Sequence, residues 1–174
     1  MMNTMQCQGL PAQVDAHARV LVLGSMPGIA SLQAAQYYAH PRNRFWPLMA
    51  ALCDVDAMLP YAARMEALLA AGVGVWDVIG RCERAGSLDA SIVRGSEVAN
   101  ALPALIDTLP ALRAICCNGG TAHRAFLRHI APSLSARAQA LPVWSLPSTS
   151  PANAAWPLPR LQVAWAPLAA ALTA

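Results

Sequence analysis

The chain has 174 residues, of which 56% are hydrophobic and 12% are charged, and its formal net charge is +3. This composition excludes a disordered chain, and the prolines and serines in the longest uncharged windows exclude a membrane-spanning run. Because a chain of this length can bury a sizeable core, we expect one domain over residues 1–174. The first residues lack the basic and apolar regions of a secretory signal, so we expect a cytoplasmic protein.

The basic residues and the cysteines bear on whether the chain contacts phosphate or holds a metal site. All twelve basic residues are arginines, which suits contact with phosphate but is explained equally well by genomic base composition. The five cysteines include no C-x-x-C pair, which argues against a zinc site or an iron–sulfur cluster. We expect most of them to be small buried apolar residues in a reduced compartment.

Short apolar runs alternate with segments of helical spacing along the chain. The runs predict four buried strands, at 19–23 (RVLVL), 72–79 (GVGVWDVI), 113–120 (RAICCNGG) and 141–148 (LPVWSLPS). Helices are predicted at 44–53, at 60–71 with Pro60 in the first turn, at 121–130 with Thr121 as N-cap, and at 161–172 with an interruption at Pro167.

This alternation predicts an α/β fold, a three-layer α/β/α sandwich around a central, mostly parallel four-stranded sheet. Open parallel sheets bind ligands beyond the carboxyl ends of their strands. The four predicted strands all end in polar or glycine-rich residues, so we expect these ends to converge on one site. They are Gly24-Ser25, Asp77, Asn118-Gly119 and Ser148-Thr149-Ser150.

The segment that follows the first strand, GSMPGIASLQAAQYYAHPRNRFWP at 24–47, combines a small-residue turn with aromatic rings and amides. This set suits a flat, uncharged heterocycle that is stacked on a ring and held by hydrogen bonds. The chain contains no G-x-S-x-G elbow, Walker loop, G-x-G-x-x-G fingerprint or H-E-x-x-H pair. The usual signals of hydrolase triads, nucleotide hydrolysis, dinucleotide binding and zinc proteases are therefore missing.

The stretches GSMPG and YYAHPRNRFWP, followed by GVWDVIGRCERAGSLD, CNGGTA and LPSTSPAN, resemble the motifs of the uracil-DNA glycosylase superfamily. Within it, the chain most resembles the hypoxanthine-DNA (deoxyinosine) glycosylase family, over roughly residues 19–155. The resemblance implies hydrolysis of the N-glycosidic bond of a damaged base in a nucleotide flipped out of the duplex. It implies no cofactor, and we expect a monomer that binds DNA containing deaminated bases and no membrane.

The resemblance also implies roles for residues of the 24–47 segment. Tyr38 aligns with the aromatic residue on which the flipped base stacks, with core packing as the alternative, and its neighbour Tyr37 is expected in the core. Met26 stands where the mismatch-specific enzymes commonly carry an asparagine or aspartate, and a thioether cannot activate water. The hypoxanthine family instead implies Asn43 as the catalytic residue, whose alternative is a helix N-cap.

The base itself is expected to contact Ser25, Met26, Tyr38, Asp77 and Asn118. A carboxylate only accepts hydrogen bonds, so Asp77 would accept from hypoxanthine N1–H while O6 would need another donor, such as a backbone N–H. The alternatives are a structural aspartate that caps a turn or pairs with an arginine, and a strand-to-helix turn residue at Asn118. His40 could stabilise charge on the leaving group or make an orienting hydrogen bond.

The expected DNA contacts come from two loops. They are Gly24, Pro27, Gly28, His40 and Arg42 in the first, and Ser148, Thr149 and Ser150 in the second, whose alternative is a proline-rich surface loop. Arg44 is also expected to face phosphate with Arg42, whereas Arg124 and Arg128 fit a solvated helix face better. Ala152 stands near the position where some relatives insert a bulky apolar wedge into the duplex, so the wedge is weak or absent here.

The sequence thus predicts a monofunctional DNA glycosylase that releases deaminated bases, hypoxanthine first, and leaves an abasic site. The chain contains no lysine, which excludes the Schiff-base lyase step of bifunctional glycosylases apart from an N-terminal amine route. Two alternatives stay open. One is a mismatch-specific uracil/thymine-DNA glycosylase, which Met26 disfavours, and the other is a non-catalytic DNA-binding protein, for which salt-dependent binding without product would be the sign.

Overall fold

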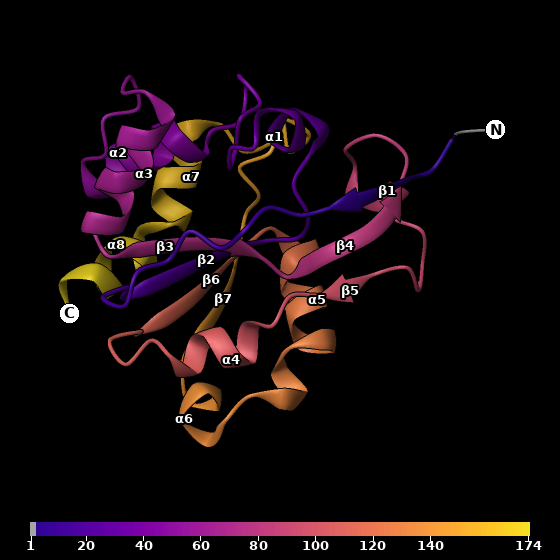
Figure 1. The fold of residues 1–174 in the computed structure, drawn as a ribbon. Coiled ribbons are helices and arrows are strands. Elements are labelled where there is room, and N and C mark those ends of the chain that lie inside the picture. The colour runs from indigo at the N-terminus through magenta and orange to yellow at the C-terminus, as the bar shows by residue number, and fades with distance from the viewer. Residues whose placement is uncertain (1–2) are drawn as a thin grey trace.

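The centre of the fold is a parallel sheet of four strands, β2 (Val20–Gly24), β3 (Val73–Asp77), β6 (Ala114–Asn118) and β7 (Val143–Leu146). The structure is a computed structural model that describes residues 3–174, and its strands lie in the order β3-β2-β6-β7 (Figure 1). Each strand falls within or beside the run that predicted it, so the predicted sheet is confirmed.

Helices cover both faces of this sheet because the side chains of its buried strands alternate between two apolar clusters. Val20 and Val22 of β2 belong to one cluster, and Leu21 and Leu23 belong to the other. The first face is covered by α2 (Phe45–Cys53), α3 (Tyr61–Ala70), α7 (Leu158–Ala164) and α8 (Ala166–Thr173), and the second by α4 (Leu102–Asp107), α5 (Gly120–His129) and α6 (Ala136–Gln139) (Figure 1). The predicted three-layer α/β/α architecture is confirmed.

Three helix boundaries differ notably from the prediction. Pro60 is the N-cap of α3, which begins at Tyr61, so Pro60 precedes the first turn and is not part of it. Helix α5 begins at Gly120, and its N-cap is Gly119 with φ 101°, so Thr121 is inside the helix and is not its cap. The last predicted helix is two helices, α7 and α8, which meet at the fully buried Trp165. Pro167 therefore lies in the first turn of α8, where its missing N–H leaves no helical hydrogen bond unmade.

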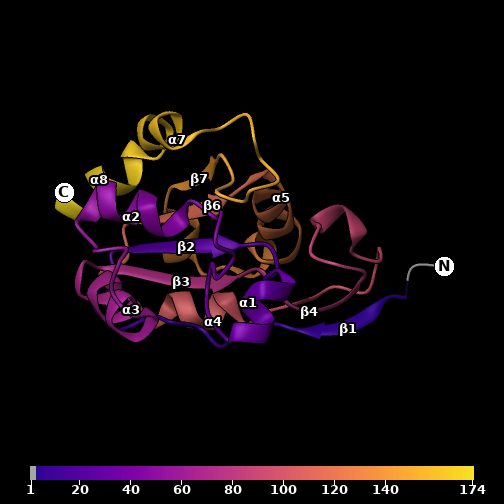
Figure 2. The same ribbon diagram turned by 90° about the horizontal axis from the view of Figure 1, so that it is seen from above.

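A second sheet, which the sequence did not predict, lies beside the first (Figure 2). It is antiparallel and contains β1 (Met5–Gln8), β4 (Ile79–Arg84) and β5 (Val98–Ala99) in the order β1-β4-β5. These strands are short and partly charged, so they lack the apolar runs that mark buried strands. Only Val78 separates β3 from β4, so the chain passes directly from one sheet to the other.

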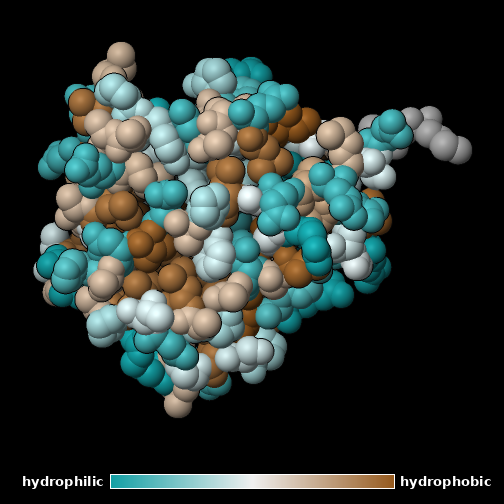
Figure 3. Space-filling view, in the orientation of Figure 1, coloured by the Kyte–Doolittle hydropathy of each residue, from teal (hydrophilic) through white to brown (hydrophobic). Residues whose placement is uncertain are grey.

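The remaining elements are the short helix α1 (Ile29–Ala34) and two 3-10 turns, η1 (Asp89–Ser91) and η2 (Ala131–Ser133). On the face shown in Figure 3, hydrophobic residues gather near the middle and hydrophilic residues dominate the margins. Within residues 3–174, every helix is too short or too polar to cross a lipid bilayer.

Phe126 tests how much the packing of α5 contributes to the fold. Its side chain is 1% exposed in the cluster between α5 and the sheet, whereas that of its neighbour Leu127 is 50% exposed. We expect Phe126→Ala to lower the free energy of unfolding by about 3–5 kcal/mol, because it removes buried apolar surface and leaves a cavity. Leu127→Ala is the matched control, and urea denaturation of both variants checks the result. Equal losses in the two variants would contradict this packing.

Candidate active site

A pocket of about 570 Å³ lies at the carboxyl ends of the four parallel strands. Gly24, Asp77 and Asn118 end β2, β3 and β6, and Ser148 follows β7 closely; all four residues line the pocket. In the sheet, β3 lies on one side of β2 and β6 lies on the other. The direction in which successive strands are added therefore reverses next to β2. This is the position at which open α/β sheets bind ligands, and the predicted convergence is confirmed.

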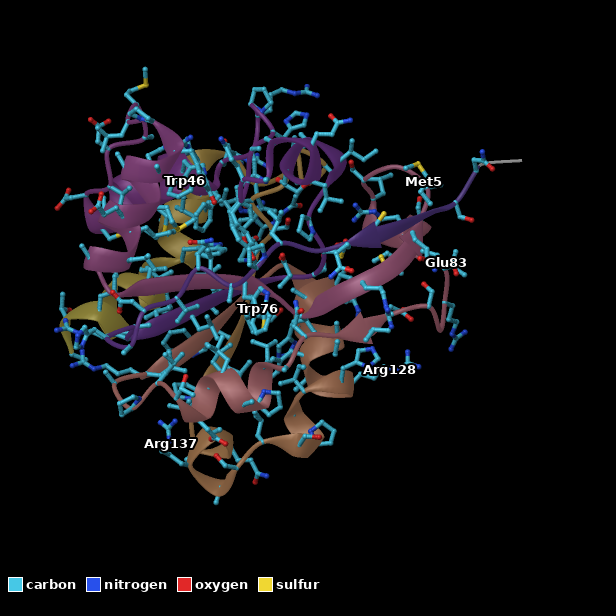
Figure 4. All side chains as sticks on the ribbon, viewed as in Figure 1. Met5, Trp46, Trp76, Glu83, Arg128 and Arg137 are labelled. Atoms are coloured by element: carbon cyan, nitrogen blue, oxygen red, sulfur yellow. The ribbon has the colours of Figure 1, made fainter. Side chains whose placement is uncertain are left out.

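Nearly all of the residues singled out in the sequence lie around this pocket. Arg42 and Arg44, which were expected to face phosphate, are outside the lining, and Arg42 is exposed. The others are Gly24, Ser25, Met26, Pro27, Gly28, Tyr38, His40, Asn43, Asp77, Asn118, Ser148, Thr149 and Ser150. Arg128 lies on the outer side of α5 (Figure 4) and is exposed, as is Arg124.

A chain of hydrogen bonds through the fully buried Thr149 connects three distant segments of the pocket. The Asn118 amide holds Thr149 twice: its Oδ1 accepts from the Thr149 backbone N–H at 2.9 Å, and its Nδ2 donates to Thr149 Oγ1 at 3.0 Å. Thr149 Oγ1 in turn donates to Asn43 Oδ1 at 2.9 Å. The end of β6 thereby fixes the position of Asn43.

These contacts also determine which end of the Asn43 amide is free. Asn43 Oδ1 accepts both from Thr149 and from the Phe45 N–H, at 2.9 Å, at the start of α2. Because both partners donate, the oxygen must face them, and the orientation of the amide is set. Within residues 3–174, Asn43 Nδ2 makes no hydrogen bond, and Asn43 lines the pocket. Asn43 therefore combines a contact to the start of α2 with an N–H₂ group that has no partner among the described residues.

Arg44 clamps the loop that carries Thr149, which corrects the expectation that it faces phosphate. Its Nη1 donates to the Trp156 carbonyl at 2.6 Å, and its Nη2 donates to the carbonyls of Ser150 and Asn153 at 2.6 and 3.0 Å. Its backbone N–H donates to the Thr149 carbonyl at 3.1 Å. The planar guanidinium is thus occupied by carbonyl groups of its own chain, and it holds residues 149–156 in place.

The two adjacent tyrosines have different environments, as predicted. Tyr37 is 3% exposed in the core, where its hydroxyl donates to the Pro11 carbonyl at 2.7 Å. Tyr38 lines the pocket and stacks on Phe45, with ring centroids 4.0 Å apart and planes at 23°. Since Phe45 covers one face of the Tyr38 ring, only the opposite face can receive a planar ligand. The Tyr38 hydroxyl is buried and has no hydrogen-bond partner among the described residues.

His40 makes the orienting hydrogen bond that was one of its two expected roles. Its Nδ1 accepts from the Arg42 backbone N–H at 3.1 Å, and its carbonyl accepts from the Asn43 N–H at 2.9 Å. Because Nδ1 is an acceptor in this turn, the ring proton of a neutral His40 lies on Nε2. His40 lines the pocket, so an Nε2–H donor is available at its edge.

Asp77 lies 4% exposed beneath Gly24, its partner in the register of β2 and β3. A Cβ atom on residue 24 would lie only 2.4 Å from Asp77 Oδ1, so glycine is required there to leave room for the carboxyl group. Asp77 Oδ2 is buried without a hydrogen-bond donor among the described residues. Burial, with the nearby Asp89 carboxylate, raises the pKa of Asp77 to about 7 although Arg84 opposes the shift.

One wall of the pocket was missed in the sequence. It consists of residues 87–90, between β4 and β5, and hydrogen bonds of the Ser25 and Ser87 side chains connect it to the end of β2 and to α1. Ser25 Oγ donates to Asp89 Oδ1 at 2.7 Å, and the Ile29 N–H donates to Ser87 Oγ at 2.8 Å. The stretch GSLD at 86–89 was part of the resemblance, but no spacing in the sequence indicated that it returns to the pocket.

Two apolar residues complete the description of the pocket. Met26 is 6% exposed and packs with Ile79 and Cys82 while it lines the pocket, so it offers a soft apolar surface. Ala152 is exposed at the pocket edge. In the part of the chain that the structure describes, no three His, Cys, Asp or Glu side chains are grouped closely enough to hold a metal ion.

The chain is similar to known proteins in sequence and in structure. The chain is 37% identical over 116 residues to a hypoxanthine DNA glycosylase of Methanosarcina barkeri, covering 66% of this chain and 72% of the relative. It is 36% identical over 113 residues to the hypoxanthine DNA glycosylase of Methanosarcina acetivorans, covering 64% and 70%. A solution NMR structure of a proposed uracil DNA glycosylase from M. acetivorans matches with a TM-score of 0.80 and 29% identity, over 98% of this chain and all of that one.

The family match extends over nearly the whole chain. The model of the uracil DNA glycosylase superfamily matches residues 11–169, which include all four parallel strands and every residue of the hydrogen-bond chain through Thr149. This chain therefore belongs to the uracil DNA glycosylase superfamily.

Proposed function

We propose that the protein is a monofunctional DNA glycosylase that releases deaminated bases, hypoxanthine first, from nucleotides flipped out of DNA, and that it acts as a monomer. Family membership and the two relatives named hypoxanthine DNA glycosylase support this activity. The observation that carries the proposal is the Asn43 amide, which lines the pocket, is fixed through its oxygen by Thr149 and Phe45, and has an Nδ2 group with no hydrogen-bond partner within residues 3–174.

The flipped base stacks on the open face of Tyr38, because Phe45 already covers the other face of that ring. Base–aromatic stacking contributes about 1–3 kcal/mol per base and tolerates different bases. Asp77 faces the hydrogen-bonding edge of the base from beneath Gly24, and Ser25 and Met26 line the adjoining surface. Asn118 acts mainly through Thr149, because its amide oxygen and one N–H are occupied by that residue.

Asn43 positions the attacking water. Its Nδ2 donates to the water oxygen, which leaves a lone pair of that oxygen free to approach C1′ of the deoxyribose. An amide removes no proton, but glycosidic bonds break through an oxocarbenium-like transition state that depends on positioning and charge stabilisation. His40 Nε2–H stabilises the negative charge that develops on the departing base.

The DNA backbone contacts the loops around the pocket mouth. The backbone of Gly24, Pro27 and Gly28 and the hydroxyls of Ser148 and Ser150 are short groups that suit phosphate and sugar oxygens. The exposed guanidinium of Arg42 adds a positive charge beside them. Ala152 is too small to fill the gap left by a flipped base, so lesions whose pairing is already weak are the preferred substrates.

Base release under single-turnover conditions tests the proposed function. Matched duplexes carrying deoxyinosine, deoxyuridine or deoxyxanthosine are incubated with the protein at low salt, and alkali converts abasic sites to strand breaks. We expect the fastest release from deoxyinosine. Release from deoxyuridine in mismatches alone would favour the mismatch-specific activity. Salt-dependent binding of all three duplexes with no strand break would contradict the proposal and favour a DNA-binding protein.

Two substitutions test separately the Asn43 amide and the Thr149 hydroxyl that holds it. We expect Asn43→Ala to slow base release by about 100-fold, the usual loss when one positioned hydrogen-bond donor is removed from an active site. Thr149→Val removes the donor to Asn43 Oδ1 and frees the amide to rotate, so we expect a loss of about tenfold. Thr108→Val, on an exposed residue outside the pocket, is the control for hydroxyl loss. A Thr149→Val rate equal to that of the control would remove the positioning role.

Tyr38→Ala tests the stacking surface. We expect the variant to bind a deoxyinosine duplex about tenfold more weakly, while its affinity for the undamaged duplex changes little, because only a flipped base contacts the ring. Fluorescence anisotropy with both duplexes at one salt concentration measures the two affinities. An equal loss on both duplexes would show that Tyr38 contributes to general DNA binding or to folding instead.

A further inference from the structure

Two carboxyl groups from different parts of the chain face the same pocket. Asp77 ends β3, and Asp89 lies on η1 in the wall formed by residues 87–90. Ser25, at the end of β2, donates to Asp89 Oδ1 and so holds the second carboxyl group at the pocket. Asp89 Oδ2 makes no hydrogen bond within residues 3–174, so Ser25 is the one hydrogen-bond partner of this carboxyl group in the described chain.

Charged and titratable groups face these carboxyls from several elements. Arg84 of β4 is 1% exposed and donates to the Pro27 carbonyl, but its Nε and Nη1 have no hydrogen-bond partner among the described residues. It therefore hydrogen-bonds neither carboxyl group. Tyr37 and Tyr38 also face Asp77, and burial followed by the Asp77 charge raises the pKa of both hydroxyls, so the two tyrosines stay neutral.

The two aspartates have different environments, and the ionised form is less favourable for Asp77 than for Asp89. Asp77 is almost fully buried, and its Oδ2 has no donor within the described chain, so its ionised form is poorly solvated. Asp89 is partly exposed, and although burial raises its pKa, the Ser25 hydroxyl, Arg84 and Arg124 favour its charged form. When two carboxyls share a site, the less solvated one is protonated first.

We propose that Asp89 is a positioning residue that keeps the Asp77 carboxyl group neutral, so that Asp77 donates one hydrogen bond to a deaminated base and accepts another from it. This inference rests on the proposed function, because it concerns the same base-binding pocket. It assigns a role to Asp89, and it replaces the expectation that Asp77 is an acceptor only.

The chemistry of hypoxanthine suits a neutral acid. Its edge presents an N1–H donor next to the O6 acceptor, and uracil and xanthine carry the same N–H beside C=O. A neutral carboxyl has an O–H donor next to a C=O acceptor, so it pairs with both atoms at once, whereas a carboxylate would place a negative oxygen against O6. The final torsion of an aspartate is broad, so Asp77 can turn both oxygens to the base.

The pH dependence of single-turnover hypoxanthine release tests this pairing. If the neutral form of Asp77 is required, wild-type release falls as the pH rises through about 7. Asp77→Asn carries a permanent donor and acceptor, so its rate should not fall over that range, and at pH 8 it should exceed the wild-type rate by about tenfold. A wild-type rate that rises through pH 7, together with loss of release in Asp77→Asn at every pH, would overturn the proposal.

Asp89→Asn tests whether the charge of Asp89 keeps the Asp77 carboxyl group neutral. The substitution keeps the acceptor for Ser25 Oγ but removes the charge, so the midpoint of the fall should move to lower pH by about one unit. Asp107→Asn is a matched control, because Asp107 Oδ1 also accepts from a serine, Ser135, at 2.7 Å, outside the pocket. Its midpoint should equal that of the wild type. Equal midpoints in Asp89→Asn and the wild type would exclude the role of Asp89.

A second measurement keeps this test independent of the proposed activity. The carboxyl ¹³C signals of the free protein, titrated without DNA, report the midpoint of Asp77 directly in the wild type, Asp89→Asn and Asp107→Asn. The inference predicts a wild-type midpoint near 7 that falls only in Asp89→Asn. A midpoint in the ordinary range of aspartates would overturn it even if the protein releases hypoxanthine. Absence of base release with the predicted midpoints would instead count against the function alone.

Discussion

The site depends on the hydrogen bonds that join Asn118, Thr149 and Asn43. These residues come from the end of β6, from the loop after β7 and from the segment before α2, and 106 positions separate Thr149 from Asn43. Each group in the chain has one possible orientation once the Thr149 backbone N–H is satisfied, because donors must meet acceptors at every step. A network of this kind, in which the side-chain oxygens of all three residues are hydrogen-bonded, fixes an amide at the pocket more firmly than a solvated loop could. The guanidinium of Arg44 holds the same loop from its other side.

The two sheets contribute different parts of the pocket. The parallel sheet brings four strand ends to one edge, and the strands themselves contribute to the pocket only the last residues of β2, β3 and β6, whereas β7 is followed by the lining residue Pro147. The antiparallel sheet supplies the wall that carries Asp89, because β4 continues from β3 after a single residue and then returns through η1. Asp77 lies where the two sheets meet, under a glycine whose missing side chain leaves it space. A carboxyl group in this position is shielded from water and close to a second carboxyl, which explains its unusual pKa.

The sequence predicts the parallel sheet and its strand ends because buried strands are continuous apolar runs, and a run followed by glycine or a polar residue shows where the strand stops. It predicts neither the second sheet nor the wall at Asp89, since short, partly charged strands carry no such signal. The sequence also does not predict long-range side-chain contacts. Nothing near Arg44 in the chain indicates that three carbonyls of a distant loop accept its hydrogen bonds. The charge state that we propose for Asp77 could not be predicted from the sequence, because the charge state of a side chain depends on neighbours that only the fold brings together.

We propose that a deaminated base leaves the duplex and enters the pocket between Tyr38 and Asp77. The most direct measurement is the crystal structure of the protein bound to a duplex that carries 2′-fluoro-2′-deoxyinosine, whose glycosidic bond is stabilised because fluorine disfavours an oxocarbenium-like transition state. We expect hypoxanthine to stack on the face of Tyr38 opposite Phe45, with its N1–H and O6 at the Asp77 carboxyl and a water between Asn43 Nδ2 and C1′. A base that remains stacked in the duplex, or DNA bound to a different face of the protein, would contradict it.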